Sequence, residues 1–349
     1  MARLRRVDCA GPGITRRRRG RGFEYLDQNG NRVEDLDVLA RINQLAIPPA
    51  WQDVWICADP MGHIQATGVD ARGRKQYRYH DRWRERRAQQ KFDEMTDFAR
   101  ALPGMRRRVA RDLAGDGITR ERVLACAVRL LDRGFFRVGG EDYAAENESY
   151  GLATIHKRHV KLRRGGVLQF DYPAKSGRRR IQSIVDPEVH EIVAALKRRR
   201  GGSPELLAYR DGRRWRDLKS ADINAYIKEI TGGDFSAKDF RTWNATVLAA
   251  VALAVSGPAA QRSKTARKRA ITRAVQEVAR YLGNTPAVCR ASYVDPRVFD
   301  RFEGGLTIGG VLDAIGEEGD LGAVHGSAEQ AVLDLIARDE ASPALEKVA

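Results

Sequence analysis

The sequence predicts an α+β protein, with a small β-rich N-terminal domain and a larger, mainly α-helical domain that carries a β-hairpin. Short runs of β-branched and aromatic residues, separated by turn residues, fill residues 23–82. Helical periodicity dominates residues 83–305. Within that second region, two strand-like runs (VLQFDY and RIQSIV) flank the turn sequence PAKSG, which indicates a hairpin.

The charge of the chain indicates a polyanionic partner. The 349 residues are 42% hydrophobic and 31% charged, as in folded proteins, and their formal net charge is +16. From residue 311 onward there are nine acidic and two basic residues, a net charge of −7, so residues 1–310 carry +23. We expect nucleic acid as the partner. An anionic membrane is the alternative, but the sequence shows no lipidation motif and no basic amphipathic anchor.

Other sequence features limit the class of protein. The four cysteines lie far apart and form no Cys-x-x-Cys pair, which fits a reducing cytosol and argues against a zinc ribbon. The N-terminus lacks the apolar segment of a signal peptide, and the longest apolar run, residues 247–255, is too short to span a membrane. The sequence shows neither a P-loop nor an acidic metal cluster, so we expect no cofactor and no metal. We expect a cytoplasmic, nucleoid-associated protein.

The first eighty residues predict strands and turns. Residues 1–22 are basic and are either a solvated tail or a DNA-contacting arm. The Asn29-Gly30 pair then predicts a hairpin, and residues 37–45 predict a short helix. Residues 54–57 and 63–67 predict two further strands.

The sequence GRKQYRYH, residues 73–80, alternates basic or amide side chains with aromatic ones. On an extended strand Gln76 and Arg78 share one face, whereas Tyr77 and Tyr79 share the other. Such a strand can offer amide contacts to base edges and cationic or phenolic contacts to phosphates. The alternative is an edge strand with a solvated charged face.

The helical region contains an arginine in unusual surroundings. A helix is expected from residue 83 to about residue 102, where Pro103-Gly104 would stop it, and another runs from the cap Thr119 to Gly134. The apolar, glycine-containing sequence FFRVGG follows and includes Arg137. Because arginine is rarely buried without an anionic partner, Arg137 binds either a phosphate or a neighbouring acid such as Glu141.

The remaining elements follow in order. Lys175 lies at the tip of the predicted hairpin, where it could reach into a groove of a partner, although most such lysines are only solvated. Further helices are expected over residues 186–197, 221–231, 238–255 and 261–280. The last of these has six basic residues between Arg262 and Arg273. Residues 306–349 are expected to be helical and acidic, and to form either a docked cap or a partly mobile tail.

Four motifs, in this order and at these spacings, resemble the type IB DNA topoisomerases in the compact form of poxviruses and bacteria. They are FFRVG (135–139), AKSG (174–177), KDFRTW (238–243) and LGNT with SY (282–285 and 292–293). Residues 73–79 and 147–152 fit as well, and the resemblance covers about residues 20–305. The chain thus divides into a basic arm (1–22), a β-rich domain (23–82), a mainly helical domain (83–305) and an acidic C-terminal extension (306–349). The resemblance implies that the β-rich domain binds DNA and that the helical domain is catalytic, with the fold of tyrosine recombinases.

The resemblance also implies a role for each site residue. Tyr293 would be the nucleophile, with Arg137 and Arg241 clamping the non-bridging oxygens of the scissile phosphate. Lys175 would be the general acid for the departing 5′-oxygen, and Lys238 a further active-site lysine in a proton relay with Arg137. Asn284 stands where many relatives have His; it can donate a hydrogen bond but carries no charge. DNA contacts in the small domain would come from Arg74, Gln76, Tyr77 and Tyr79.

The implied activity is relaxation of supercoiled duplex DNA by a monomer, without ATP or metal. One strand would be cut through a 3′-phosphotyrosyl bond, rotate and be religated. A tyrosine site-specific recombinase is the nearest alternative, but recombinases typically have His-x-x-Arg where this chain has Lys238-x-x-Arg241. A non-enzymatic basic protein that binds DNA or RNA is the other alternative.

Overall fold

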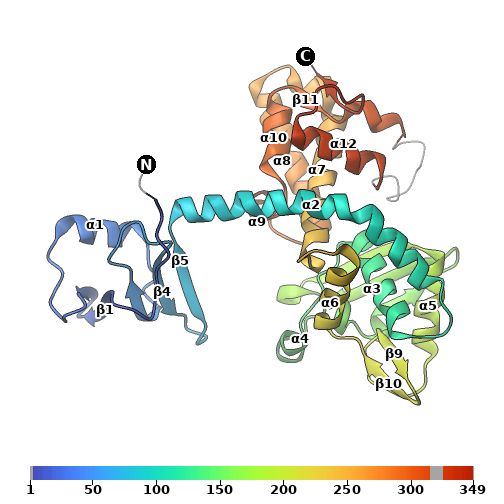
Figure 1. Ribbon diagram of the computed structural model, residues 1–349, viewed down its shortest axis with the longest axis horizontal. Helices are drawn as coiled ribbons and strands as arrows, with labels where there is room; N and C mark the ends of the chain where they lie inside the picture. Colours follow the sequence, from blue (N-terminus) through green and yellow to red (C-terminus); the bar gives the residue numbers. More distant parts are fainter. Residues whose placement is uncertain (1–2, 315–324, 349) are drawn as a thin grey trace. The chain divides into compact units, whose positions relative to one another are not determined.

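The computed structural model describes residues 3–314 and 325–348, and it divides into two compact units, one ending at Phe92 and one beginning at Asp93. Unit 1 contains an antiparallel five-stranded sheet of order β2-β1-β3-β4-β5 and a short helix (Figure 1). Its elements are β1 (Ile14–Arg19), β2 (Gly22–Leu26), α1 (Leu36–Gln44), β3 (Gln52–Ile56), β4 (Ile64–Val69) and β5 (Lys75–Tyr79). Unit 1 therefore has the small β-rich architecture that the sequence predicts.

The strand β1 lies inside the segment that we expected to be a basic arm, so that expectation was wrong for residues 14–19. Ile14 is buried in the core of unit 1. The guanidinium of Arg16 donates to the carbonyl oxygens of Pro48 (3.1 Å) and Trp51 (2.6 Å), and Arg17 pairs with Glu24 at 2.6 Å. These arginines stabilise the sheet of unit 1. Residues 1 and 2 lie outside the described residues.

Unit 2 is mainly helical and carries small sheets, which confirms the α+β class. Its helices are α2 (Asp81–Leu113, beginning in unit 1), α3 (Arg120–Gly134), α4 (Glu141–Asn147), α5 (Pro187–Arg198), α6 (Ser220–Thr231), α7 (Ala237–Gln261), α8 (Lys264–Leu282), α9 (Pro286–Ser292), α10 (Pro296–Glu303) and α12 (Ser327–Ala337). Its strands are β6 (Val160–Leu162), β7 (Val167–Pro173), β8 (Arg179–Val185), β9 (Ala208–Asp211), β10 (Arg214–Asp217), β11 (Leu306–Thr307) and β12 (Glu346–Lys347).

Helix α2 continues through Pro103, so the predicted stop at this residue was wrong. A proline inside a helix removes one backbone hydrogen bond. Here the helix is retained because its apolar face is buried on both sides of the proline, at Phe98, Leu102, Met105 and Val109. These side chains recur at intervals of three or four residues, so burial of a continuous stripe offsets the lost hydrogen bond.

The predicted hairpin is present as β7 and β8 of the three-stranded sheet β6-β7-β8. Its tip is a short turn, Lys175–Gly177, in which Ser176 has a positive φ of 65°. Phe136 packs edge-on against Phe170, in the middle of β7, with ring centroids 4.8 Å apart. This contact fixes the segment that follows α3 against the hairpin.

The C-terminal extension is docked where the structure describes it, which decides between the two possibilities that the sequence left open. Helix α12 lies beside α10 and α7 (Figure 1), and its apolar side chains Ala331, Val332 and Leu335 are buried. Strands β11 and β12 pair, and the amide of Val348 donates to Gly305 O at 2.7 Å. Residues 315–324 and 349 of the extension lie outside the described residues.

A buried ionic network joins this extension to the rest of unit 2. Glu329 of α12 accepts two hydrogen bonds from Arg106 of α2, at 2.5 and 2.9 Å, and one from Trp243 Nε1 of α7, at 2.9 Å. Arg106 also binds both carboxylate oxygens of Asp132, at the end of α3. Glu329, Asp132 and Trp243 are all buried. Removing their polar groups from water costs free energy, and the hydrogen bonds within the network offset that cost.

Glu329→Gln is expected to lower the free energy of unfolding by about 2 kcal/mol or more, because the half-buried Arg106 loses one of its two carboxylates and the buried Trp243 loses a charged acceptor. Glu340→Gln is the matched control, because Glu340 is an exposed acid of the same extension that pairs with Lys347 at 2.8 Å. That control should change stability by less than about 0.5 kcal/mol. Denaturant unfolding followed by tryptophan fluorescence measures both; equal losses would contradict a structural role for the network.

Candidate active site

Arg241 lies in the first turns of α7 and is almost completely buried. Its guanidinium donates to two backbone carbonyls, Phe135 O from the segment after α3 and Leu282 O (2.9 Å) at the end of α8. It also lies over the ring of Tyr293, 5.4 Å from the centroid. One side chain therefore fixes three chain segments around a single point.

Arg137 is held by its backbone in the loop between α3 and α4. Its carbonyl accepts a hydrogen bond from Leu152 N at 2.8 Å, and the neighbouring Gly139, with φ +82°, packs directly against Gly151. A side chain at either glycine would collide with backbone, so both positions require glycine. The alternative pairing of Arg137 with Glu141 is not formed, because Glu141 instead binds the backbone amide and hydroxyl of Ser220, at 2.7 and 2.9 Å.

Asn284 follows the glycine that ends α8. Gly283 adopts the left-handed conformation, φ +63°, which turns the chain back toward the hairpin. The Oδ1 atom of Asn284 then accepts a hydrogen bond from Arg137 Nη2, which leaves the amide nitrogen as a donor. This Nδ2 atom is buried and has no well-aligned hydrogen-bond partner among the described residues.

Tyr293 follows the last residue of α9, and two contacts fix its backbone. Its amide donates to Cys289 O at 2.9 Å, and its carbonyl accepts from the hydroxyl of Thr246 on α7 at 3.3 Å. The same hydroxyl accepts from Asp295 N at 3.1 Å. Thr246 therefore couples the position of the tyrosine to helix α7, which carries Arg241.

The surroundings of Tyr293 favour its ionised form. Burial opposes ionisation of the phenol, but the positive charge of Arg241 and the approach of the Asn284 amide outweigh it and lower the pKa of Tyr293. Burial and the positive charge of Arg137 in turn lower the pKa of Arg241. A site that concentrates this much positive charge is suited to bind an anion.

These residues surround a cavity of about 330 Å³. Its lining includes Arg137, Lys175, Lys238, Arg241 and Tyr293. Lys175 and Lys238 are exposed side chains, from the hairpin tip and from the first turn of α7. Asn284 reaches the same group through its hydrogen bond to Arg137. The structure therefore brings together all six residues that the sequence singled out in the larger domain.

The four predicted DNA contacts of the small domain lie on or beside β5 of unit 1. Tyr77 and Tyr79 are exposed on one face and stack with their centroids 5.9 Å apart. Gln76 and Arg74 instead bind the carboxylate of Asp70, at 2.9 and 2.7 Å. The hydrogen bond from Arg74 lowers the pKa of Asp70 to about 2, so this carboxylate remains charged at neutral pH.

Arg180 is a residue of the site that sequence reasoning missed. It projects from β8, and it donates to Tyr281 O (2.7 Å) and to Gln182 Oε1 (2.6 Å). Its positive charge contributes to lowering the pKa of Arg241. The only signal in the sequence was an arginine at the start of the returning hairpin strand, which is also typical of a solvated strand end.

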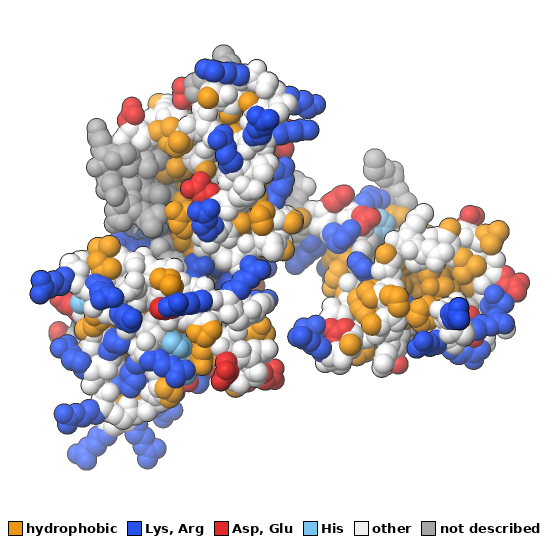
Figure 2. Space-filling model, turned by 180° about the vertical axis from the view of Figure 1, so that it is seen from behind, with side chains coloured by type: hydrophobic (Ala, Val, Ile, Leu, Met, Phe, Trp, Pro, Cys, Tyr) orange, Lys and Arg blue, Asp and Glu red, His pale blue; other side chains and the backbone are white. Residues whose placement is uncertain are grey.

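The surface of unit 2 is rich in Lys and Arg, as Figure 2 shows for one face. In the described part of the chain no three His, Cys, Asp or Glu side chains gather as they would around a metal ion. None of the helices in that same part is both long enough and apolar enough to cross a membrane.

Comparison with known proteins gives consistent matches. Residues 80–303 match the family described as eukaryotic DNA topoisomerase I, catalytic core, and residues 22–70 match the bacterial DNA topoisomerase IB N-terminal domain. The chain is 33% identical over 288 residues to DNA topoisomerase 1B of Acanthamoeba polyphaga mimivirus, covering 81% of this chain and 85% of that protein.

Two cellular proteins match over shorter stretches. DNA topoisomerase 1 of Daucus carota is 28% identical over 130 residues, or 37% of this chain and 15% of that protein. DNA topoisomerase 1 of Schizosaccharomyces pombe is 27% identical over 157 residues, or 45% of this chain and 18% of that protein. The chain therefore spans most of the viral relative but less than a fifth of these two.

Proposed function

Because this chain belongs to the type IB DNA topoisomerases, isomerases that act on DNA, we propose that it relaxes supercoiled duplex DNA through a covalent bond to Tyr293. Relaxation would require neither ATP nor a metal ion, and the protein would act as a monomer in the nucleoid. We also propose that unit 2 has the catalytic fold shared with tyrosine recombinases. Membership of the topoisomerase family favours relaxation over the exchange of strands between recombination sites.

The observation that supports this mechanism is the convergence of cations on one phenol. Arg241 lies over the Tyr293 ring, Arg137 and Asn284 are hydrogen-bonded beside it, and Lys175 and Lys238 line the same cavity. Attack on a phosphodiester increases the negative charge on the non-bridging oxygens. Two guanidiniums and an amide donor can stabilise that charge in the transition state.

The reaction would proceed in one displacement and its reversal. The Tyr293 oxygen forms a bond to phosphorus while the bond between phosphorus and the 5′-oxygen breaks, and Lys175 gives a proton to that departing oxygen. A phenolate is a fair leaving group, so the 5′-hydroxyl can reverse the step and reseal the strand. Rotation of the free end between the two steps would release supercoils.

Membership of the family also supports a DNA-binding role for unit 1. We propose that the exposed pair Tyr77 and Tyr79 contacts the DNA backbone or bases, and that Arg74 and Gln76 contact DNA on exchanging their bonds to Asp70. Because such contacts neutralise phosphates, binding should weaken steeply as salt concentration rises.

The cleavage rate of the wild-type enzyme should rise with pH, with a midpoint below the ordinary tyrosine value of about 10, because the attacking species is the phenolate and its pKa is lowered. Asn284→Ala removes one of the groups that lower this pKa, so its midpoint should move to higher pH. Single-turnover cleavage across a pH series measures both profiles; identical midpoints would show that the amide does not act on Tyr293.

The direct test of the proposed function is relaxation of a negatively supercoiled plasmid in EDTA, without ATP. We expect complete relaxation. Failure to relax the plasmid, combined with strand exchange between specific sites, would instead indicate a recombinase. Binding without either reaction would indicate a non-enzymatic DNA-binding protein.

A further inference from the structure

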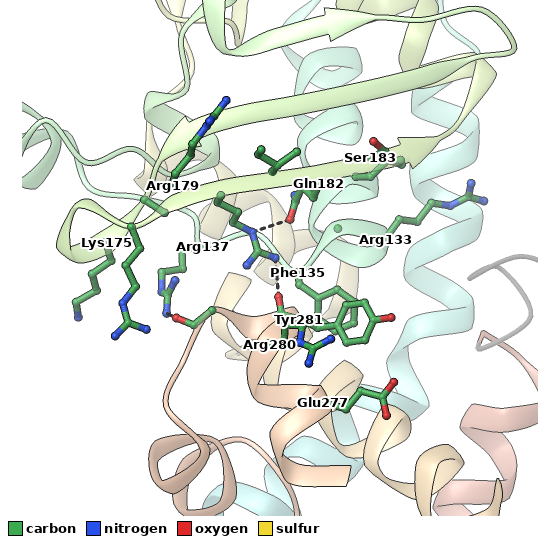
Figure 3. A pocket seen from close by; sticks show the side chains of 17 residues that line it. Arg133, Phe135, Arg137, Lys175, Arg179, Gln182, Ser183, Glu277, Arg280 and Tyr281 are labelled. Atoms are coloured by element: carbon green, nitrogen blue, oxygen red, sulfur yellow. Dashed lines mark hydrogen bonds between the residues drawn. The ribbon is translucent and has the colours of Figure 1, made fainter. Parts of the chain in front are cut away.

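A second cavity adjoins the one that contains Tyr293. It has a volume of about 490 Å³ and lies between the hairpin β7–β8 and the C-terminal end of α8 (Figure 3). Arg137 and Lys175 line both cavities, whereas Tyr293 and Arg241 belong to the lining of the first. The two cavities therefore meet at Arg137 and Lys175.

The wall of this second cavity is strongly basic. Its cationic side chains come from the hairpin, α3, the loop after α3 and α8, and they are Arg133, Arg137, Lys175, Arg178, Arg179, Arg180 and Arg280. Arg133 and Arg179 pair with Asp186 and Asp171, which lie outside the lining. Among the described residues of the lining, Glu277 is the one carboxylate. The excess of positive charge favours an anion with several charges.

Arg180 is a partly buried residue of this wall, and neutral oxygens hold it. Figure 3 draws its hydrogen bonds to Gln182 and to the carbonyl of Tyr281 as dashed lines. Because Gln182 Oε1 accepts from Arg180, the amide nitrogen of Gln182 is left as a donor, and it is buried with no hydrogen-bond partner among the described residues. The wall thus combines an uncompensated guanidinium with an unused donor, as a phosphate site requires.

The position of the cavity relative to the reaction indicates which phosphates it binds. In a displacement at phosphorus the attacking and leaving oxygens lie roughly in line, on opposite sides of the phosphorus atom. Tyr293 attacks from the first cavity, and Lys175, at the junction, protonates the leaving oxygen. We propose that the second cavity binds the phosphates of the DNA strand that begins at the departing 5′-oxygen. This inference rests on the proposed function and assigns a subsite to it.

The test removes the charge of single DNA phosphates and, in separate variants, the charge of single arginines of the cavity. Methylphosphonate groups are placed one at a time on the leaving side of a cleavable duplex, and single-turnover cleavage and religation are measured. With the wild-type enzyme, at least one position should slow a step about tenfold, the effect expected from losing a charged hydrogen bond. In Arg178→Met or Arg280→Met, the same methylphosphonate should add less than about a twofold effect, because the contact is already lost.

Arg178 and Arg280 are exposed, so both variants should fold, and Arg180→Met tests the partly buried guanidinium. Arg163→Met is the matched control, since Arg163 binds Gln169 at 3.0 Å outside the cavity. In this control the full methylphosphonate effect should remain.

One outcome would overturn the subsite and leave the proposed function standing. It is normal cleavage of unmodified DNA, together with equal methylphosphonate effects in the wild type and in the cavity variants. A second outcome would also overturn the subsite. If no methylphosphonate had an effect, but tripolyphosphate inhibited cleavage in a way that depends on Arg178 and Arg280, the cavity would bind a soluble polyanion and not the DNA strand. If the wild-type enzyme formed no adduct on unmodified DNA, the proposed function itself would fail and the assignment with it.

Discussion

Tyr293→Phe is expected to abolish plasmid relaxation and the covalent DNA adduct while leaving duplex binding unchanged. The substitution removes only the phenol oxygen, which is the proposed attacking atom, and leaves the ring that packs beneath Arg241. Loss of a covalent nucleophile lowers the rate on the order of 10⁴-fold or more. The measurement is relaxation over a wide range of enzyme concentration, with binding followed by fluorescence anisotropy.

Tyr209→Phe provides the control, because Tyr209 of β9 belongs to the same unit and lies outside the lining of both cavities. It should relax DNA at close to the wild-type rate. Relaxation by Tyr293→Phe within tenfold of the wild-type rate would rule out Tyr293 as the nucleophile. Loss of duplex binding in that variant would instead show that the phenol supports the site rather than reacts.

Lys175→Ala should slow cleavage of an ordinary phosphodiester by about 10²- to 10⁴-fold, the range for removal of a general acid. Its effect should nearly vanish on a substrate with sulfur at the 5′-bridging position, because a thiolate leaves without a proton. Single-turnover cleavage of the two substrates separates proton donation from any role in holding phosphate. A second variant, Lys161→Ala, removes an exposed lysine of the same sheet and should cleave both substrates normally.

Equal slowing of the two substrates by Lys175→Ala would exclude it as the acid and would leave it a phosphate-binding residue. In that event Lys238 is the next candidate, since it also lines the cavity that contains Tyr293. The result would alter one assignment and leave the role of the tyrosine intact.

Sequence reasoning succeeded where local pattern determines structure. The hairpin around Lys175 follows from two strand-like runs and a turn sequence, and the cap at Thr119 begins α3 as expected. The family motifs supplied the six residues of unit 2 that the proposed chemistry uses, and their roles stay predictions. Each motif lies beside a turn or a helix end, where the required residue types are easily recognised.

The failures involve contacts between residues that are distant in sequence. Nothing near Pro103 shows that α2 buries an apolar stripe on both sides of it, and a run of arginines hides the alternation of β1. Arg180 is part of the site because Tyr281, a hundred residues later, turns its carbonyl toward it. Glu329 is likewise buried because Arg106 and Trp243 meet it from two other helices. Each of these features depends on tertiary contacts, which local sequence patterns do not reveal.

The most direct test of the account is to trap the covalent complex on a 3′-blocked, cleavable duplex in EDTA without ATP, digest it and sequence the DNA-linked peptide. The mechanism predicts a single peptide that carries the 3′-phosphate of the cleaved strand on Tyr293. Attachment through a 5′-phosphate, or to any other residue, would contradict it.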